Sequence, residues 1–402
     1  MAAVANFQSP PAKSDFNLRE SSVPSEIYQE FDNLRSKCPV AYSSENGGFW
    51  MLTRYEDIKN CAADTKTFIS SVKAVIPSDP RGTRRPPLNT DPPTHTPYRT
   101  AIDRTLKPSR LKRLETVLED HARREWKKLV DRGGGNAATE FGANFAAWVE
   151  VTWLNLADET APVLASTAAA WVNAWREQNK EDVRFHSEKL YDMARALFRE
   201  RRVRPRDVDS DPASSLLAER VNGEPILEEK LIDALRQCLV VGMVAPPILF
   251  GNITAHLARN KALQSNLRAN PSLIPNAVEE FVRLYVPYRG FCRTASCPVS
   301  MHGRTVNPGE PITMTYAAAN RDPDVFPDPH AFVLGRENAA AHLGFGRGRH
   351  RCAGMPLARM ALAAGVKVML DMTSDWEIDG ELEYAKMPEM GIVSCPIRIV
   401  KA

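Results

Sequence analysis

The chain has 402 residues, of which 43% are hydrophobic and 25% charged, with a formal net charge of +3. This composition is ordinary for a globular protein, and the small net charge gives no general indication of nucleic-acid binding. No stretch approaches eighteen uninterrupted apolar residues, so no membrane span is expected. The N-terminus lacks the basic segment and apolar run of a signal peptide, so we expect a cytoplasmic protein. The seven cysteines form no CxxC pair and no zinc-site spacing.

The pattern along the chain predicts a flexible N-terminal arm over residues 1–23 and a single domain over 24–402. The first predicted elements are a helix over 25–37, with Ser25 as its cap, and a strand followed by a helix over 49–58. A Pro- and Arg-rich loop then covers 70–93, a length that indicates a functional or disordered segment.

The rest of the chain is mostly helical in pattern. Helices are predicted over 94–106, 110–131, 139–157, 162–177, 180–202, 229–268, 272–285 and 354–372. Short β-like runs occur at 299–316 and 392–400. The predicted fold class is therefore mainly α with a minor β part (α+β), with a long central helix.

Residues 342–354, "HLGFGRGRHRCAG", carry the strongest chemical signal. The Gly-rich loop ends in Cys352 just before the last predicted helix, where backbone donors and the helix dipole favour a thiolate. Gly346, Gly348 and Gly354 would let backbone approach a flat partner closely, and a haem-ligating cysteine needs such an environment. Phosphate binding is a rival interpretation, but no lysine-containing phosphate loop is present. The simplest alternative is a basic surface loop with an incidental cysteine.

Four motifs in order resemble those of the cytochrome P-450 family in its soluble, bacterial-type form. Phe345-x-x-Gly348-x-His350-x-Cys352-x-Gly354 resembles the family's haem-binding signature. "EEFVR" resembles its buried Glu280/Arg283 pair, "NRDPDVFPDP" (320–329) the meander that locks onto that pair, and "THTPYR" (94–99) the start of a haem-facing helix. The resemblance extends from about residue 24 to the C-terminus.

This resemblance implies haem b as the cofactor and Cys352 as its iron ligand. It places four side chains near the haem carboxylates, Phe345 against the sulfur, and Glu280 and Arg283 in a structural role. The four side chains are His95, Arg99, Arg293 and His350.

The predicted central helix departs from the family pattern. The family usually has Ala-Gly-x-(Asp/Glu)-Thr-Thr before a Gly-Asn pair. Counting back from Gly251-Asn252, Gly242 matches the Gly, while Val244 and Ala245 stand in the acid and alcohol positions. Valine and alanine can neither donate a proton nor hold a water by side chain.

Two adjacent prolines follow these positions. Pro246 and Pro247 lack the N–H groups that would bond the carbonyls of Gly242 and Met243, so we expect a kink. The freed carbonyls could hold a water or a substrate donor. Alternatively, the prolines only widen a groove that the family already has.

The missing acid–alcohol pair leaves the reaction open. A monooxygenase of specialised metabolism that oxidises a small organic substrate, with protons delivered by the substrate itself, is the main interpretation. A peroxide-driven peroxygenase and a non-oxygenating member (coupling, rearrangement, reduction) are alternatives. A haem-binding sensor or carrier is an alternative of another class.

The resemblance also suggests where the substrate binds. Arg289 stands where the family usually has an apolar pocket residue, and a cation there needs an acidic substrate or an internal carboxylate. The other candidate substrate contacts are Arg85, Met243, Val244, Ile248 and Ile392.

A basic face on the cysteine side suits an acidic ferredoxin or flavodoxin-type electron donor acting in trans. This face comprises Arg110, Lys112, Arg113, Arg347, Arg349, Arg351 and Arg359. We expect a monomer.

Overall fold

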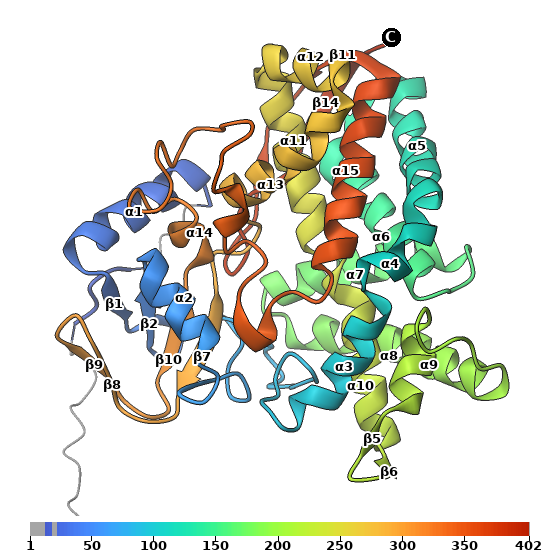
Figure 1. Cartoon of the computed structure of the whole chain (residues 1–402). Helices are drawn as coiled ribbons and strands as arrows, with labels where there is room; N and C mark the ends of the chain where they lie inside the picture. The colour runs from blue at the N-terminus through green and yellow to red at the C-terminus, as the bar shows by residue number, and fades with distance from the viewer. Residues whose placement is uncertain (1–12, 18–21, 402) are drawn as a thin grey trace, which may run out of the picture.

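The computed structural model describes residues 13–17 and 22–401. Figure 1 shows a large helical part beside a smaller part that holds the main sheet. The predicted fold class, mainly α with a minor β part, is confirmed.

The helical part is built around α15 (Met355–Met372), which packs along α5 (Glu115–Arg132). The other helices of this part are α3 (His95–Thr105), α4 (Pro108–Leu111), α6 (Ala143–Trp153), α7 (Thr160–Arg176), α8 (Lys180–Val203), α9 (Pro212–Ala218), α10 (Glu228–Val241), α11 (Ala245–Arg259), α12 (Lys261–Ala269) and α13 (Ile274–Leu284). A π-helical turn, η3 (Ala137–Gly142), precedes α6 and packs against α11.

The main sheet has the strand order β1-β2-β10-β7-β3. Its strands are β1 (Val40–Ser43), β2 (Phe49–Leu52), β3 (Phe68–Ile69), β7 (Phe291–Ala295) and β10 (Pro311–Met314). The β2–β10 pair is parallel and the others are antiparallel, so segments from both ends of the chain lie side by side (Figure 1). Next to this sheet lie α1 (Pro24–Lys37), α2 (Tyr55–Ala63) and α14 (Tyr316–Ala319).

Smaller sheets complete the fold. The three-stranded one pairs β11 (Thr373–Ile378) with β14 (Pro396–Lys401) and β14 with β4 (Gly134–Asn136). Three two-stranded ribbons join β5 (Arg220–Val221) to β6 (Glu224–Pro225), β8 (Val299–Met301) to β9 (Arg304–Val306), and β12 (Glu383–Tyr384) to β13 (Ile392–Ser394).

The predicted N-terminal arm is only partly within the described residues. Residues 13–17 do not lie free of the domain: Phe16 is buried with its ring 5.9 Å from that of Phe49, and the Asp15 carboxylate accepts a hydrogen bond from the Tyr42 N–H. Residues 1–12 and 18–21 of the arm lie outside the described part, so the division at residue 23 stays a prediction.

Several predicted element boundaries differ in the structure. Ser25 is not a cap, because α1 begins at Pro24, whose missing N–H suits a first turn. The helix predicted over 110–131 is split into α4, a 3-10 turn and α5. The short helix α9 was not predicted, and it is capped by the Asp211 side chain, which accepts a hydrogen bond from the Ser214 N–H.

The predicted central helix is interrupted at residues 242–244, so α10 and α11 are separate helices. Pro246 and Pro247 therefore occupy the first turn of α11 and not a helix interior. The first-turn N–H groups of a helix have no intrahelical partner, so proline is tolerated there. The strain expected of two mid-helix prolines is thus avoided.

Residues Glu228–Arg259 taken together are long and apolar enough to cross a membrane, but 72% of their apolar window is buried inside the protein. This burial is typical of a core helix, so the segment is weak evidence for a membrane span.

Candidate active site

Cys352 lies in the long segment between α14 and α15, close to the first turn of α15. Its backbone N–H donates to the Phe345 carbonyl over 2.8 Å, which closes the loop on itself. Gly348 adopts φ +72° and comes so close to the Ala62 carbonyl of α2 that a side chain would not fit. This glycine therefore fixes the loop on α2, a different reason from the expected approach to a flat partner.

The environment of the Cys352 sulfur is unusual. Burial raises the pKa of the thiol, while hydrogen bonds from the backbone N–H groups of Gly354 and Met355 lower it. The residue is nevertheless solvent-exposed. We infer that the Cys352 sulfur lines a space left between the surrounding segments.

The central turn faces an internal space as well. Val241, the last residue of α10, is 50% exposed although the residues before it, Cys238–Val240, are buried. Two exposed residues inside the core, one on the Cys352 loop and one on the central turn, indicate a hollow between these elements. A flat cofactor between α15 and the central turn would fit that hollow.

Two buried histidines lie together at the edge of this region. The rings of His95 on α3 and His350 have centroids 4.5 Å apart, and the Nε2 atom of each has no hydrogen-bond partner among the described residues. Burial and nearby arginines lower the pKa of His95 to about 4 and that of His350 to about 3. Such a group of buried donors fits the negatively charged carboxylates of a haem.

Arg293 and Arg99 contribute to the same region in different ways. Arg293 on β7 is buried, and its Nε atom lacks a partner within the described residues. Arg99 is engaged already: Nε donates to Asp103 over 2.7 Å and Nη1 to the Arg349 carbonyl over 3.3 Å. His95 and Arg293 therefore offer free donors to an anion, and so does His350, whose Nε2 atom makes no hydrogen bond but lies 3.8 Å from the Asp91 carboxylate. Arg99 anchors the cysteine loop to α3.

Phe345 is held beside the cysteine loop by a cation. The Arg359 guanidinium lies 5.1 Å from the Phe345 ring centroid, and Glu279 holds Arg359 through contacts of 2.5 and 2.6 Å. Burial would raise the pKa of Glu279, but hydrogen bonds from His342 and Arg359 and their charges lower it to about 2.

Glu280 and Arg283 form a fully buried bidentate ion pair, with both N–O distances 2.8 Å. Arg283 also donates to the carbonyls of Asn320, Pro329 and Ala331, which belong to the 318–332 segment. The pair thus ties α13 to the segment that leads toward the cysteine loop.

The central turn is free of side-chain polarity at the expected acid and alcohol positions. Val244 is buried and Ala245 begins α11. The carbonyls of Gly242 and Met243 accept no hydrogen bond from the part of the chain that the structure describes. Met243 and Ile248, two candidate pocket residues, are buried beside this turn.

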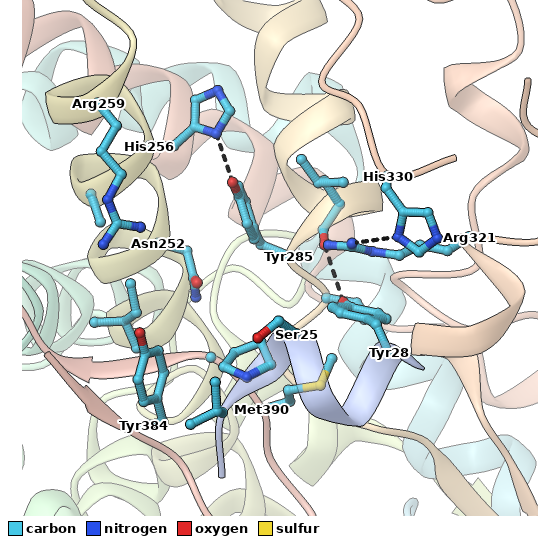
Figure 2. Close-up of a pocket in the computed structure, with 17 residues that line it drawn as sticks. Ser25, Tyr28, Asn252, His256, Arg259, Tyr285, Arg321, His330, Tyr384 and Met390 are labelled. Carbon is cyan, nitrogen blue, oxygen red and sulfur yellow. Dashed lines mark hydrogen bonds between the residues drawn. The ribbon is translucent and has the colours of Figure 1, made fainter. Parts of the chain in front are cut away.

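Ile392 lies elsewhere. It lines a cavity of about 310 Å³ between the start of α1, α11 and the end of α13, together with Met390, His256 and Arg321 (Figure 2). Cys352 does not line this cavity, so it is distinct from the hollow next to the cysteine. A role for Ile392 at the reaction centre would require that it also reach that hollow.

The two candidate substrate arginines have different surroundings. Arg289 is buried, burial lowers its pKa to about 10, and the charge that opposes this shift is Glu30 of α1. The Arg289 Nε atom has no hydrogen-bond partner among the described residues. Arg85 is buried too, but it points to α8: Nε donates to the Tyr191 hydroxyl over 2.9 Å.

Two buried charged residues escaped the sequence analysis. Arg236 on α10 is fully buried, and none of its three guanidinium nitrogens has a partner among the described residues. Glu150 on α6 is 5% exposed, and its Oε2 atom also lacks a partner there. The sequence contains a signal for each buried charge. Glu150 is the one charged residue of the helix "ANFAAWVEVTW", and Arg236 precedes the apolar run "CLVVGMV".

Comparison with known proteins identifies the family to which this chain belongs. The family model Cytochrome P450 matches residues 249–381. The mycinamicin IV hydroxylase/epoxidase of Micromonospora griseorubida is 30% identical over 334 residues, which are 80% of this chain and 81% of that protein. The chain belongs to the cytochrome P450 family.

Other relatives agree with this assignment. The cytochrome CYP199A2 of Rhodopseudomonas palustris is 29% identical and covers 93% of this chain and 91% of its own length. The crystal structure of CYP108D1 from Novosphingobium aromaticivorans superposes with a TM-score of 0.84 at 24% identity, over 94% of this chain and 95% of that one, and so shows the shared fold. This P450 is accordingly an oxygenase-type enzyme of the bacterial kind, and the family implies a haem cofactor.

Proposed function

We propose that this P450 is a monooxygenase for a small organic acid, with haem b held by Cys352 as iron ligand. His95, His350 and Arg293 would pair with the haem carboxylates, Arg99 would fix the loop, and Phe345 would cover the sulfur. When bound, the haem would supply the activation of dioxygen with electrons from a donor protein. The chain's own task is then to hold the substrate, exclude water and manage protons.

The observation that carries the substrate class is the unpaired guanidinium of Arg236. A buried cation without a partner is costly, and a carboxylate from a ligand would remove that cost through a bidentate pair. The carboxylate of Asp79 is shared between Arg81 at 2.8 Å and Arg85 at 3.5 Å. Among the described residues none pairs with Arg236.

The surroundings of Arg236 support a built anion subsite. Its guanidinium carbon lies 4.4 Å from the centroid of the Trp171 ring on α7 and 5.9 Å from that of Tyr191 on α8. Burial and the charge of Arg85 lower its pKa well below the usual range. The 70–93 loop, the α7–α8 pair and α10 meet here, and the loop carries Arg85, one of the candidate substrate contacts.

The position of Arg236 also suggests the size of the substrate. Arg236 lies on α10 (Glu228–Val241), and Met243 lies seven residues later in the turn that follows this helix. At a helical rise per residue, the two positions are about 10 Å apart along the direction of α10. A carboxylate at Arg236 would therefore leave room for a single ring or a short chain before the central turn. Arg289, which has Glu30 as its opposing charge, is not needed for this role.

Binding of matched ligands tests the proposal. A series of aromatic and aliphatic carboxylic acids, and their methyl esters, would be titrated into the haem-loaded protein while the Soret band is followed. We expect the acids to bind and the esters to bind at least ~10-fold more weakly. Arg236→Gln should weaken acid binding at least ~30-fold. Arg84→Gln, which changes an exposed arginine of the 70–93 loop, should not weaken it. Equal binding of acids and esters, or full acid affinity in R236Q, would overturn the proposal.

The route of the protons belongs to the same proposal. With Val244 and Ala245 unable to deliver protons, a polar group of the substrate would organise the water at the free carbonyls of the central turn. The same absence favours a peroxide-driven reaction as the second candidate. Sustained turnover with hydrogen peroxide and no electron donor would support that alternative.

An acidic donor protein has a suitable docking face. Lys112, Arg347, Arg349 and Arg351 are exposed around the cysteine loop. Two expected members of that face are engaged internally, Arg110 with Asp209 and Arg359 with Glu279. A ferredoxin-type partner, a monomeric state and a cytoplasmic location complete the proposal.

A further inference from the structure

The geometry points to Glu150 of α6 as the acid that serves the central turn in place of the missing acid–alcohol pair. We infer that its carboxyl group donates a proton to a water held at the carbonyls of Gly242 and Met243. This inference rests on the oxygenase reaction of the family and not on the proposed substrate class.

The first observation is the position of the carboxyl group. A Cβ atom on Gly242 would collide with the Oε1, Cδ and Cγ atoms of Glu150. The carboxyl group therefore lies directly on the central turn, where a side chain at position 242 would begin. Two residues further along, the family's acid position holds Val244, so an acid from a second helix has replaced the one missing from the central helix.

The second observation is that Glu150 has no structural partner. Its side chain is 5% exposed, and Oε2 is buried without a hydrogen bond from the described residues. A buried carboxyl group kept only for stability is normally paired, as Glu125 is with the Trp148 indole at 2.9 Å and Lys128 at 2.6 Å. An unpaired acid next to two free backbone carbonyls is arranged to bind a ligand such as water.

The third observation is the electrostatic setting. Burial raises the pKa of Glu150 to about 8, and no described cation opposes the shift. The titratable groups that feel its charge are the thiols of Cys238 on α10 and Cys352 ahead of α15. Glu150 is thus a neutral proton donor near pH 7, within electrostatic reach of the cysteine loop.

The proton balance is simple. Reduction of dioxygen to one water and one oxygen atom inserted into substrate consumes two electrons, from the donor protein, and two protons. Glu150 breaks its O–H bond, its proton passes to the held water, and a proton of that water passes to the oxygen atom that leaves as water; the second proton follows the same route after Glu150 has been reprotonated. The carboxylate then takes up a proton from water that enters the space exposing Val241 and Cys352.

The test combines a spectroscopic and a kinetic measurement on the haem-loaded protein. Infrared difference spectra between pH 6 and pH 9.5 should contain the C=O stretch of a protonated carboxyl group that is lost as the pH rises. Glu150→Gln should remove that band, and Glu125→Gln should leave it in place. In turnover, E150Q should lower the product formed per electron pair by roughly 10- to 100-fold and increase the hydrogen peroxide released, while E125Q should not.

Several outcomes would overturn the inference. The infrared band could survive in E150Q, or E150Q could keep the wild-type coupling and pH profile. If E150Q does not fold, Glu150→Asp, which withdraws the carboxyl group by one methylene, should shift the band and lower the coupling. An unchanged band and coupling in E150D would be equally decisive. Since the infrared measurement needs no substrate, its result is independent of whether organic acids bind.

Discussion

The carboxyl group of Glu150 occupies the space into which any side chain at Gly242 would project. This contact joins α6 to the turn between α10 and α11. At this turn the sequence of this P450 departs from the family pattern. It also explains why position 242 must be glycine here although its φ of −76° suits any residue.

Gly242→Ala should therefore destabilise the protein, because the new methyl group forces the Glu150 carboxyl group away. Overpacking of this kind costs about 1–3 kcal/mol in the free energy of unfolding. Urea denaturation of the wild type, G242A, Glu150→Ala and the double variant would measure it. We expect the cost of G242A to fall to near zero when Glu150 is already alanine, and an unchanged cost in that background would refute the contact.

The Glu280–Arg283 pair should be essential for stability. Glu280→Ala leaves the Arg283 guanidinium buried without its carboxylate and should cost about 3–5 kcal/mol of unfolding free energy. Glu377→Ala removes a pair of similar length, 2.6 Å to Arg398, that is more than half exposed, and should cost less than about 1 kcal/mol. Similar losses in the two variants would contradict the structural role of the buried pair.

Glu279 should give a pH-dependent contribution. Its pKa is about 2 in the folded protein and about 4.5 when free, so its stabilisation is complete above pH 4.5 and is lost as the pH falls toward 2. Glu279→Gln should cost roughly 3 kcal/mol at pH 7 and less than half of that at pH 3, by urea denaturation at both pH values. Asp131→Asn, which alters an exposed carboxylate on α5, serves as the control. A cost for E279Q that does not depend on pH would rule out this account.

Pro246 should keep the Gly242 carbonyl free. Pro246→Ala introduces an N–H four residues after Gly242, so that carbonyl can be bonded and can no longer hold water. We expect the product formed per electron pair to fall several-fold. The free energy of unfolding should change little, because the N–H groups of a helix's first turn have no partner within the helix. Pro212→Ala, which changes a proline in the first turn of α9, should leave coupling unchanged. Wild-type coupling in P246A would show that this carbonyl has no part in proton delivery.

The motif residues were predictable from sequence because each lies in a short local pattern. The loop that ends in Cys352, the Glu280–Arg283 spacing on one helix face and the prolines after Ala245 all depend on neighbours a few residues away. The same local reasoning predicted one kinked helix over 229–268, which was wrong: the chain breaks at 242–244, and the prolines begin a new helix instead of bending one.

Glu150 and Arg236 were not predictable in the same way, since their meaning depends on contacts between distant segments. Arg236 gains its role from Trp171, Tyr191 and Arg85, and Glu150 from a glycine 92 residues further along the chain. Arg289 stays a predicted substrate contact: it is buried, its Nε atom has no hydrogen-bond partner among the described residues, and the charge of Glu30 on α1 acts on it. A single charged residue in an apolar helix indicates a buried charge, but only the tertiary structure shows which groups it contacts.

The central claim is that Cys352 holds haem iron as a thiolate, and the carbon monoxide spectrum of the reduced protein tests it most directly. Thiolate ligation gives a strongly red-shifted Soret band, and ligation by histidine or water does not. We predict that band for the wild type and for Cys297→Ser, which changes an exposed cysteine away from the site, and its loss in Cys352→Ser. The same red-shifted band in C352S, or its absence from the wild type, would contradict the account.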